Sequence, residues 1–459
     1  MIRIILYIVQ VALLVAVAVW LAEHPGEVRI DFLGYRIETS AALVAAAVAL
    51  LVVAAALIYR FWRSLIQAPG DFAVWRRERR RRKGYRALTQ GMVAVAAGDA
   101  DEARRQARQA DVLLGDPPLT MLLAAQAAQL EGDEDAARKY FTAMLDNPET
   151  AFLGVRGLLT QANRSGDRAK ALELAQRAHA IKPDTPWVLG ALFDLQTQAG
   201  RWEDALATLK QAARGRQVGE AEARRRRAVL LLAQARAAEA EGRDDTALDR
   251  AKDAIDLTPD LVPAVALVAR RYLKVGKIRR ATRTVERAWA ATPHPELAAA
   301  YGAIWRDEPA LDRFKAFERL AQLKPEHPES HIALAEAALE AQLWGAARNH
   351  LEQARKAEPS ARVLRLLARL EESEHNDLDA ARRWLEHAAV AVAAPQWVCT
   401  SCGAVSAEWT PLCGHCHAFD GLRWQAPVRI GGGEIAPAVE PVGAISAPPR
   451  SMSGAQPGS

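Results

Sequence analysis

A 34-residue period runs through the middle of this 459-residue chain and constrains its fold more than any other feature. Six glycines mark the period, in two runs separated by a longer step: Gly98, Gly132, Gly166, Gly200, Gly242 and Gly276. In the clearest units an alanine follows such a glycine after five positions, another after twelve, and a proline after seventeen, as in Gly166, Ala171, Ala178 and Pro183. A period of this length indicates stacked helix pairs, because one such unit cannot bury its apolar face alone.

Each recurring residue has a packing role. The glycine permits a tight turn between the two helices, the alanines let the helices approach closely, and the proline ends the second helix. The phase continues without its glycine at Gln342 and Asn376, while Glu308 begins a degenerate unit. The 42-residue step between Gly200 and Gly242 predicts eight extra residues in a longer helix or loop. With aromatic residues at only 6%, the expected class is all-α.

The pattern resembles the tetratricopeptide family over residues 85–394, in about eight units. The resemblance implies a solenoid whose concave groove holds a partner protein or peptide, and it implies binding rather than catalysis. The basic run Arg224–Arg227 is interpreted as a solvated helix face.

Two apolar runs near the N-terminus predict a membrane hairpin over residues 1–62. Ile4–Ala22 and Ser40–Tyr59 carry no charged residue and are 19 and 20 residues long, enough for a helix to cross the bilayer. The segment between them is acidic on balance, whereas arginines are dense after the second run, so the positive-inside rule places both termini in the cytoplasm. A cleaved signal peptide is the alternative for the first run, but that run is long and a second span follows.

Residues 63–84 are predicted to form a basic juxtamembrane helix. Its cationic stretch, Arg76–Lys83, lies immediately past the second span, where each basic group gains about 1 kcal/mol from anionic headgroups. We therefore interpret it as a lipid-facing collar rather than a nucleic-acid site. The small net charge of +5 agrees with a chain that has no nucleic-acid partner.

All four cysteines lie within eighteen residues, in the paired CxxC arrangement of a metal site: Cys399, Cys402, Cys413 and Cys416. Four thiolates suit zinc or iron, and zinc is favoured for a structural site in the cytoplasm. Residues 395–425 are predicted to form this ribbon around its own small apolar core, made of Trp397, Trp409, Phe419 and Trp424. Since repeats contact mainly their neighbours, the array is expected to survive loss of the ribbon.

The segment Cys413–His417 also matches CxxCH, the attachment motif of c-type haem. With haem attached there, the upstream CxxC would have no role. Covalent attachment of c-type haem also occurs outside the cytoplasm, so the metal ribbon is preferred. Histidine pairs among His294, His327, His331 and His350 could in principle ligate haem iron, although surface histidines are the simpler interpretation. Residues 426–459, rich in Gly, Pro, Ala and Ser, are expected to be a disordered tail.

The two spans, their short loop over residues 26–40, the arginine collar and the repeats together resemble HemY-type inner-membrane proteins of proteobacteria. That resemblance implies a link to late haem and porphyrin biosynthesis. The ribbon is similar to the rubredoxin-like module of LapB-type proteins, which regulate lipopolysaccharide assembly but have one span. The leading hypothesis is a multi-pass inner-membrane scaffold, not an enzyme, that holds a haem-pathway enzyme. The alternatives are a haem-binding carrier, a LapB-like regulator of envelope assembly, and a redox enzyme with iron in the ribbon.

Overall fold

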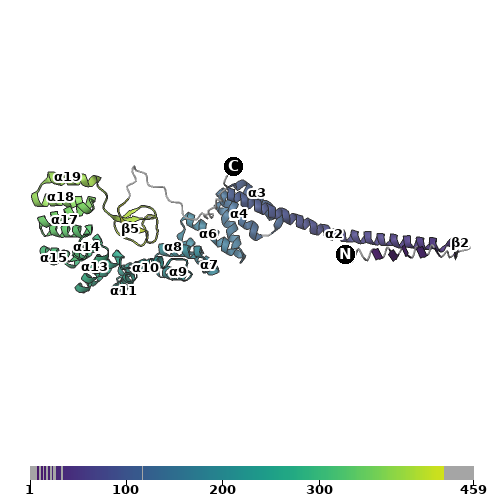
Figure 1. Ribbon diagram of the computed structural model, residues 1–459, viewed down its shortest axis with the longest axis horizontal. Helices are drawn as coiled ribbons and strands as arrows, with labels where there is room; N and C mark the ends of the chain where they lie inside the picture. The colour runs from purple at the N-terminus through teal and green to yellow at the C-terminus, as the bar shows by residue number, and fades with distance from the viewer. Residues whose placement is uncertain are drawn as a thin grey trace, which may run out of the picture. The chain divides into compact units, whose positions relative to one another are not determined.

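The computed structural model describes residues 27–32, 35–115 and 117–427, together with isolated positions between 8 and 23. The chain divides into two compact units, Met1–Met144 and Leu145–Ser459. Figure 1 shows the order of their helices. The predicted tail falls largely outside the described residues, as does most of the first predicted span.

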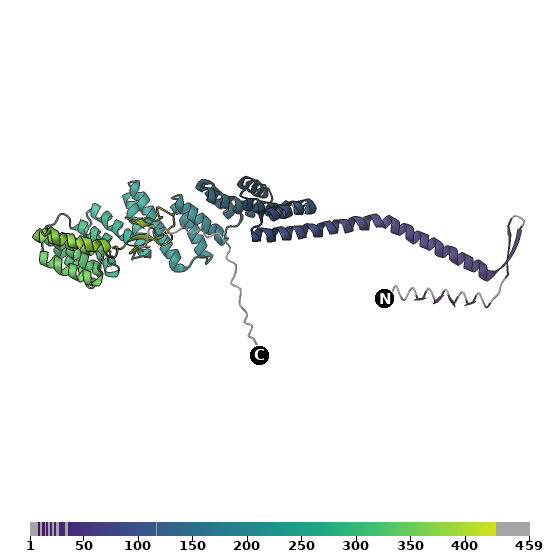
Figure 2. The ribbon, with the colours of Figure 1, turned by 90° about the horizontal axis from the view of Figure 1, so that it is seen from above.

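The first unit contains a short hairpin followed by a long helix. Strands β1 (Glu27–Phe32) and β2 (Tyr35–Ser40) pair antiparallel, and α2 (Ala41–Ala97) follows directly. The hairpin lies where the sequence predicts only a loop. Within α2, Leu43–Arg63 is long and apolar enough to cross a membrane, with a mean hydropathy of 2.4 and none of it buried against the protein. Figure 2 shows α2 continuing past this segment.

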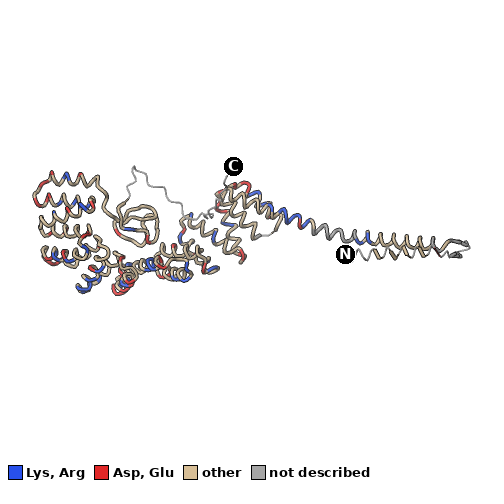
Figure 3. Tube along the Cα trace, viewed as in Figure 1, with Lys and Arg blue, Asp and Glu red and all other residues tan. Residues whose placement is uncertain are grey.

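The predicted basic collar forms part of α2 rather than a separate helix. Residues 75–83 are exposed, and Figure 3 shows their positive charges along the helix. The last turns of α2 then pair with α3 (Ala100–Leu114), and α4 (Pro117–Glu131) pairs with α5 (Glu134–Ala143) before the short turn η1 (Met144–Asp146).

The second unit is a curved array of seven helix pairs. They are α6 (Ala151–Ser165), α7 (Arg168–Ile181), α8 (Pro186–Gln198), α9 (Trp202–Arg214), α10 (Glu220–Ala240), α11 (Asp244–Leu257), α12 (Val262–Lys274), α13 (Ile278–Ala291), α14 (Pro295–Ile304), α15 (Ala310–Ala321), α16 (Pro328–Glu340), α17 (Trp344–Ala357), α18 (Ala361–His375) and α19 (Leu378–Val390). The described residues thus hold nine pairs rather than about eight, because α2 supplies the first helix of one pair. The extra residues before Gly242 lengthen α10 to 21 residues.

The repeat turns confirm the predicted phase. All six predicted glycines adopt positive φ, from 69° to 78°, a conformation that costs other L-residues about 1–2 kcal/mol. Gln342 and Asn376 adopt the same left-handed conformation with φ of 57° and 51°, although neither is a glycine. Glu308 does not, in agreement with its degenerate unit. The alanines five residues after these turns are fully or almost fully buried, for example Ala171 and Ala347 at 0% exposure.

Replacing Gly276 with alanine should destabilise its repeat by about 1 kcal/mol. Its φ is +69° and an added Cβ would meet no atom within 4 Å, so the cost is confined to the backbone. The opposite change, Gln342→Gly, should stabilise the α16–α17 pair by a similar amount, because it relieves a left-handed non-glycine residue. Hydrogen exchange of the flanking helices measures both effects, and equal exchange in Gly276→Ala and wild type would contradict the assignment.

Candidate metal centre and the adjoining cleft

The four cysteines lie on two turns of a small three-stranded ribbon. Strand β3 (Gln396–Cys399) is central, with β4 (Val405–Ser406) and β5 (Leu422–Gln425) antiparallel on either side. The first turn is closed by a hydrogen bond of 2.8 Å from the Gly403 amide to the Cys399 carbonyl oxygen, and Gly403 has a φ of 72°. The second turn, Cys413–Cys416, faces the first turn from the opposite side.

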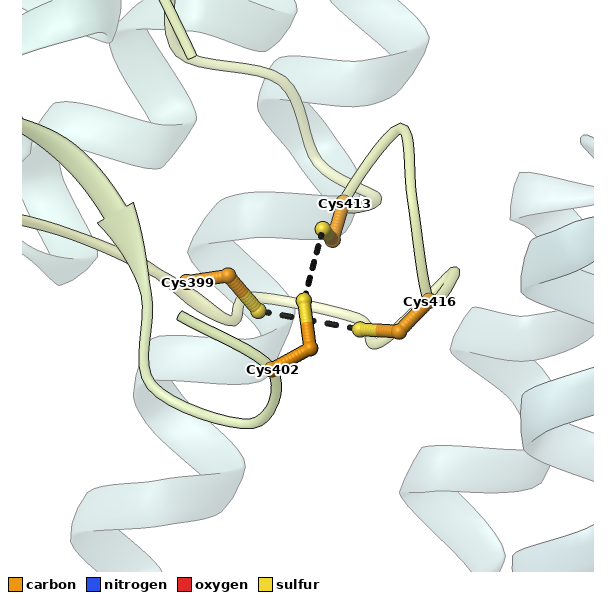
Figure 4. Close-up of side chains that lie close together, drawn as sticks. All are labelled: Cys399, Cys402, Cys413 and Cys416. Atoms are coloured by element: carbon orange, nitrogen blue, oxygen red, sulfur yellow. Dashed lines mark hydrogen bonds between the residues drawn. The ribbon is translucent and has the colours of Figure 1, made fainter. Parts of the chain in front are cut away.

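The thiols converge with the geometry of a tetrahedral site. Their four sulfur atoms all lie within 4.8 Å of one another. The Sγ atoms of Cys399 and Cys416 are 3.7 Å apart, as are those of Cys402 and Cys413 (Figure 4). A tetrahedral centre with zinc–sulfur bonds of about 2.3 Å places its sulfurs about 3.8 Å apart, whereas a disulfide needs about 2.05 Å. The donor set therefore fits a metal ion and does not form disulfides.

Backbone amides of the second turn favour a thiolate. Burial raises the pKa of the Cys413 thiol, but hydrogen bonds from the backbone of Cys416 and His415 outweigh it and bring the pKa to about 7. The thiolate is the form that binds metal. The metal-ligating cluster in the described residues contains neither His415 nor His417, and both thiols of the CxxCH motif face the other two cysteines. This arrangement agrees with the ribbon and not with haem attachment.

The ribbon packs into the array, which differs from the expected small independent core. Trp397, Cys399, Trp409, Cys413 and Leu422 belong to one buried cluster with residues of α10, α12, α13, α14 and α15. Phe419 packs edge-on against Phe193 of α8, with ring centroids 5.2 Å apart. Figure 1 shows the ribbon within the curve of the second unit. A short module with two knuckles buries little by itself, so the helices supply the rest of its core.

Two arginines of α10 hold the ribbon. Arg225 donates two hydrogen bonds, of 2.7 and 3.1 Å, to the carboxylate of Asp420, whose side chain is only 8% exposed. Arg236 lies 5.0 Å from the Trp409 ring centroid and donates to the Trp409 carbonyl oxygen at 2.6 Å. The interpretation of Arg224–Arg227 as a solvated face is therefore wrong for Arg225, which is an anchor of the ribbon.

A cavity of about 560 Å³ lies between the ribbon and the first turns of four helices. We call it the cleft. One side consists of the residues that precede α12, α14, α16 and α18, spaced 33 residues apart: Leu261, His294, His327 and Ser360. The other side includes Trp397, Arg423 and Trp424 of the ribbon. The cleft is therefore built jointly by the array and the ribbon.

His294 is the most buried polar side chain of the cleft wall that lacks a full set of partners. It is 3% exposed. The centroid of its ring lies 4.4 Å from the ring centroid of Trp424 and 5.4 Å from that of Trp397. Its Nδ1 accepts a hydrogen bond from the Glu296 amide at 3.1 Å, while its Nε2 has no partner. Burial, aided by the positive charge of Arg362, lowers the pKa of His294 to about 4. At neutral pH the ring is uncharged, with its proton on Nε2.

Acidification should destabilise the ribbon through His294. Unfolded histidine titrates near pH 6.5, so the neutral buried ring contributes stability above that pH and loses it as the pH falls toward 4, about 3 kcal/mol in total. His294→Asn keeps an acceptor for the Glu296 amide and should flatten the dependence between pH 6.5 and 5. Hydrogen exchange of β3 and β5 over this range is the measurement. Parallel pH profiles in the variant and the wild type would refute the assignment.

The cleft is not predicted by the motifs described above. The sequence nevertheless contains a sign of the cleft, because His-Pro-Glu recurs after 33 residues, at His294–Glu296 and His327–Glu329. This recurrence places a histidine N-cap at the start of both α14 and α16. Of the histidines considered as haem ligands, the structure brings His331 and His350 together, and it places His294 and His327 in the cleft wall.

Comparison with known families agrees with this architecture. Residues 26–132 match the model described as "HemY protein N-terminus", and residues 162–217 and 314–370 match a tetratricopeptide repeat model. The chain carries a HemY N-terminal domain and tetratricopeptide repeats. The β1–β2 hairpin, α2, α3 and α4 make up the HemY N-terminal domain.

Individual relatives include HemY-type and magnetosome proteins. The chain is 27% identical over 436 residues to the "Probable magnetosome protein Mms48" of Magnetospirillum gryphiswaldense, which covers 94% of each chain. It is 27% identical over 227 residues to "Protein HemY" of Escherichia coli, covering 49% of this chain and 56% of that protein. A tetratricopeptide repeat protein structure from Parabacteroides merdae covers 52% of this chain at 15% identity and a TM-score of 0.27, spanning 92% of that chain. The repeat model indicates a protein-interaction scaffold, and the HemY N-terminal domain with its apolar helix indicates association with a membrane.

Proposed function

We propose that this protein is a non-catalytic, membrane-anchored scaffold that binds a segment of a partner protein in the cleft. The observation that carries the proposal is the cleft itself: a cavity of about 560 Å³ on the inner side of a tetratricopeptide array, lined by polar side chains and by the rings of Trp397 and Trp424. Tetratricopeptide solenoids present extended concave surfaces for binding. A mixed wall of aromatic rings and hydrogen-bonding groups is typical of peptide-binding grooves.

The proposal includes a structural zinc ion held by Cys399, Cys402, Cys413 and Cys416. Four thiolates close the coordination sphere, so the ion would have no open position for a substrate and would supply folding energy rather than catalysis. Metal analysis of protein purified from membranes in detergent should find about one zinc per chain, with neither a haem absorption band nor thiolate–iron bands. Stoichiometric iron would favour a redox role instead.

The proposed location is the inner membrane, with both termini in the cytoplasm. The support is the apolar segment Leu43–Arg63, the exposed basic residues that follow it on α2, and the HemY N-terminal domain. In this arrangement the cations of Arg76–Lys83 lie against anionic headgroups, and the array lies on the same side of the bilayer.

A site-specific cross-linking experiment tests the cleft in cells. A photoreactive amino acid at Thr292, an exposed residue of the cleft wall, should give a discrete adduct with a partner protein. The same amino acid at Arg283, which is exposed on α13 and lies outside the cleft lining, should not give that adduct. Identical adducts at both positions, or none at Thr292, would argue against binding in the cleft.

We propose that the partner acts in late haem or porphyrin synthesis, a link supported by the HemY N-terminal domain and the HemY relatives. Deleting the protein should then alter cellular porphyrin and haem levels, while the purified protein shows no turnover of porphyrin substrates. Unchanged tetrapyrrole pools in the deletion strain would remove this link.

The similarity to Mms48 over 94% of both chains supports a second candidate, a scaffold for a specialised membrane compartment. That candidate predicts a fluorescent fusion confined to part of the membrane and normal tetrapyrrole pools.

A further inference from the structure

Two histidines of one repeat face each other outside the metal centre and the cleft. His331 lies in the first turn of α16 and His350 in α17, and both are half-buried. Their Nδ1 atoms are 3.2 Å apart, with ring centroids separated by 5.5 Å and ring planes inclined by 27°. The two rings therefore present the same nitrogen to a common point between the helices.

Besides stacking, the two rings share at most one hydrogen bond, in which one Nδ1 carries the proton and the other accepts it. Burial lowers the pKa of both rings, and repulsion from His331 adds to the effect on His350. Both rings are neutral at pH 7, which is the state of histidine that ligates metals. A metal ion in place of the shared proton would use both lone pairs.

The separation of the two nitrogens fits chelation. With metal–nitrogen bonds of about 2.0–2.1 Å, nitrogens 3.2 Å apart subtend an angle of about 100° at the metal, between the octahedral and tetrahedral values. The same closeness excludes axial ligation of haem, because a porphyrin would have to pass between the packed helices α16 and α17.

The carboxylates around the pair influence its charge, but among the described residues none of them clusters with the two histidines as a further ligand. The negative charge of Glu318, in α15, raises the pKa of His350, and that of Glu326, in the turn before α16, raises the pKa of His331. Two imidazoles with water ligands suit zinc, nickel, copper or iron.

We propose that His331 and His350 chelate a divalent transition-metal ion through their Nδ1 atoms, with water completing its coordination. Such an ion would tie α16 to α17 within one repeat. It would be independent of the cysteine centre, which uses none of these residues.

Nickel titration of the full chain tests the site. The protein is purified in detergent without a polyhistidine tag and with zinc already in the cysteine centre, and Ni²⁺ is added in a calorimeter. Wild type should bind one nickel per chain with micromolar affinity, and His331→Gln or His350→Gln should weaken binding at least tenfold. His387→Gln in α19 serves as the control and should bind like wild type, because this histidine packs on Trp384 and no contact with another histidine is seen within the part of the chain that the structure describes. Unchanged affinity in both test variants overturns the proposal.

A second measurement needs only the wild-type chain. Cobalt added to the zinc-loaded protein should give weak visible bands without the near-ultraviolet charge-transfer bands of thiolate ligands. A spectrum with neither these weak visible bands nor thiolate bands would show that the histidine pair holds no cobalt.

Discussion

Replacing Cys399 with serine should unfold the ribbon and also loosen the helices against which it packs. Cys399 is 1% exposed and belongs to the same buried cluster as residues of α10, α12 and α14. Losing one of four thiolates would remove the proposed zinc, and binding energy in zinc modules is largely folding energy, about 10–16 kcal/mol in isolated finger peptides. The unprotected faces of the three helices would then meet water. Hydrogen exchange should rise throughout residues 395–425 and in the inner helices α10, α12 and α14.

Ser401→Ala is the matched control, because Ser401 lies between two ligands but is itself exposed. Its exchange pattern should equal that of wild type. Helices α6, α7, α18 and α19 lie outside the shared cluster and should keep their protection in both variants. If α10, α12 and α14 also keep theirs in Cys399→Ser, the ribbon is an independent module and the repeats need only their neighbours.

Replacing Trp409 with alanine should cost about 3–5 kcal/mol, the usual range for a buried tryptophan. Trp409 is 2% exposed, and Arg236 packs on its ring. Burial already lowers the pKa of Arg236, so removing the ring leaves a desolvated cation without its aromatic contact. The ribbon's opening free energy, obtained from native-state hydrogen exchange of the full chain, is the measurement.

Trp424 provides the comparison for this substitution. It is 36% exposed on β5 and touches His294 and Trp397 at the edge of the cleft. Trp424→Ala should therefore cost much less than Trp409→Ala. Similar losses of opening free energy in the two variants would mean that the ribbon is held mainly by its own strands and metal rather than by α10.

The repeat array was predictable because its determinants are local. A left-handed turn, a buried small residue and a helix stop recur at fixed offsets, so the phase could be followed to Gln342 and Asn376, where no glycine remains. The four cysteines were predictable for the same reason, since a paired CxxC arrangement brings two knuckles to one point. The hairpin at β1 and β2 was missed, although Val28, Ile30 and Phe32 alternate with charged residues as in a strand.

The docking of the ribbon was not predictable from these rules. It depends on contacts between residues 195 and 173 positions apart in the chain, Arg225 with Asp420 and Arg236 with Trp409. A basic run on a helix has the same appearance whether its arginines meet water or an aspartate from a distant segment. The cleft was hidden for the same reason, because one of its walls comes from the ribbon.

The ribbon also changes the order in which the finished molecule can form. Stacked repeats gain their contacts from adjacent units and can fold as they leave the ribosome, starting from the N-terminal end. The contacts of Asp420 and Trp409 with α10 close loops of nearly two hundred residues, so they can form only after the whole array has been made. We expect them to need the proposed metal as well, because it would hold the two cysteine turns together. An incomplete or metal-starved chain would therefore carry most of its repeats but only one wall of its cleft. Binding of a partner in the cleft would be restricted to complete chains that hold the metal.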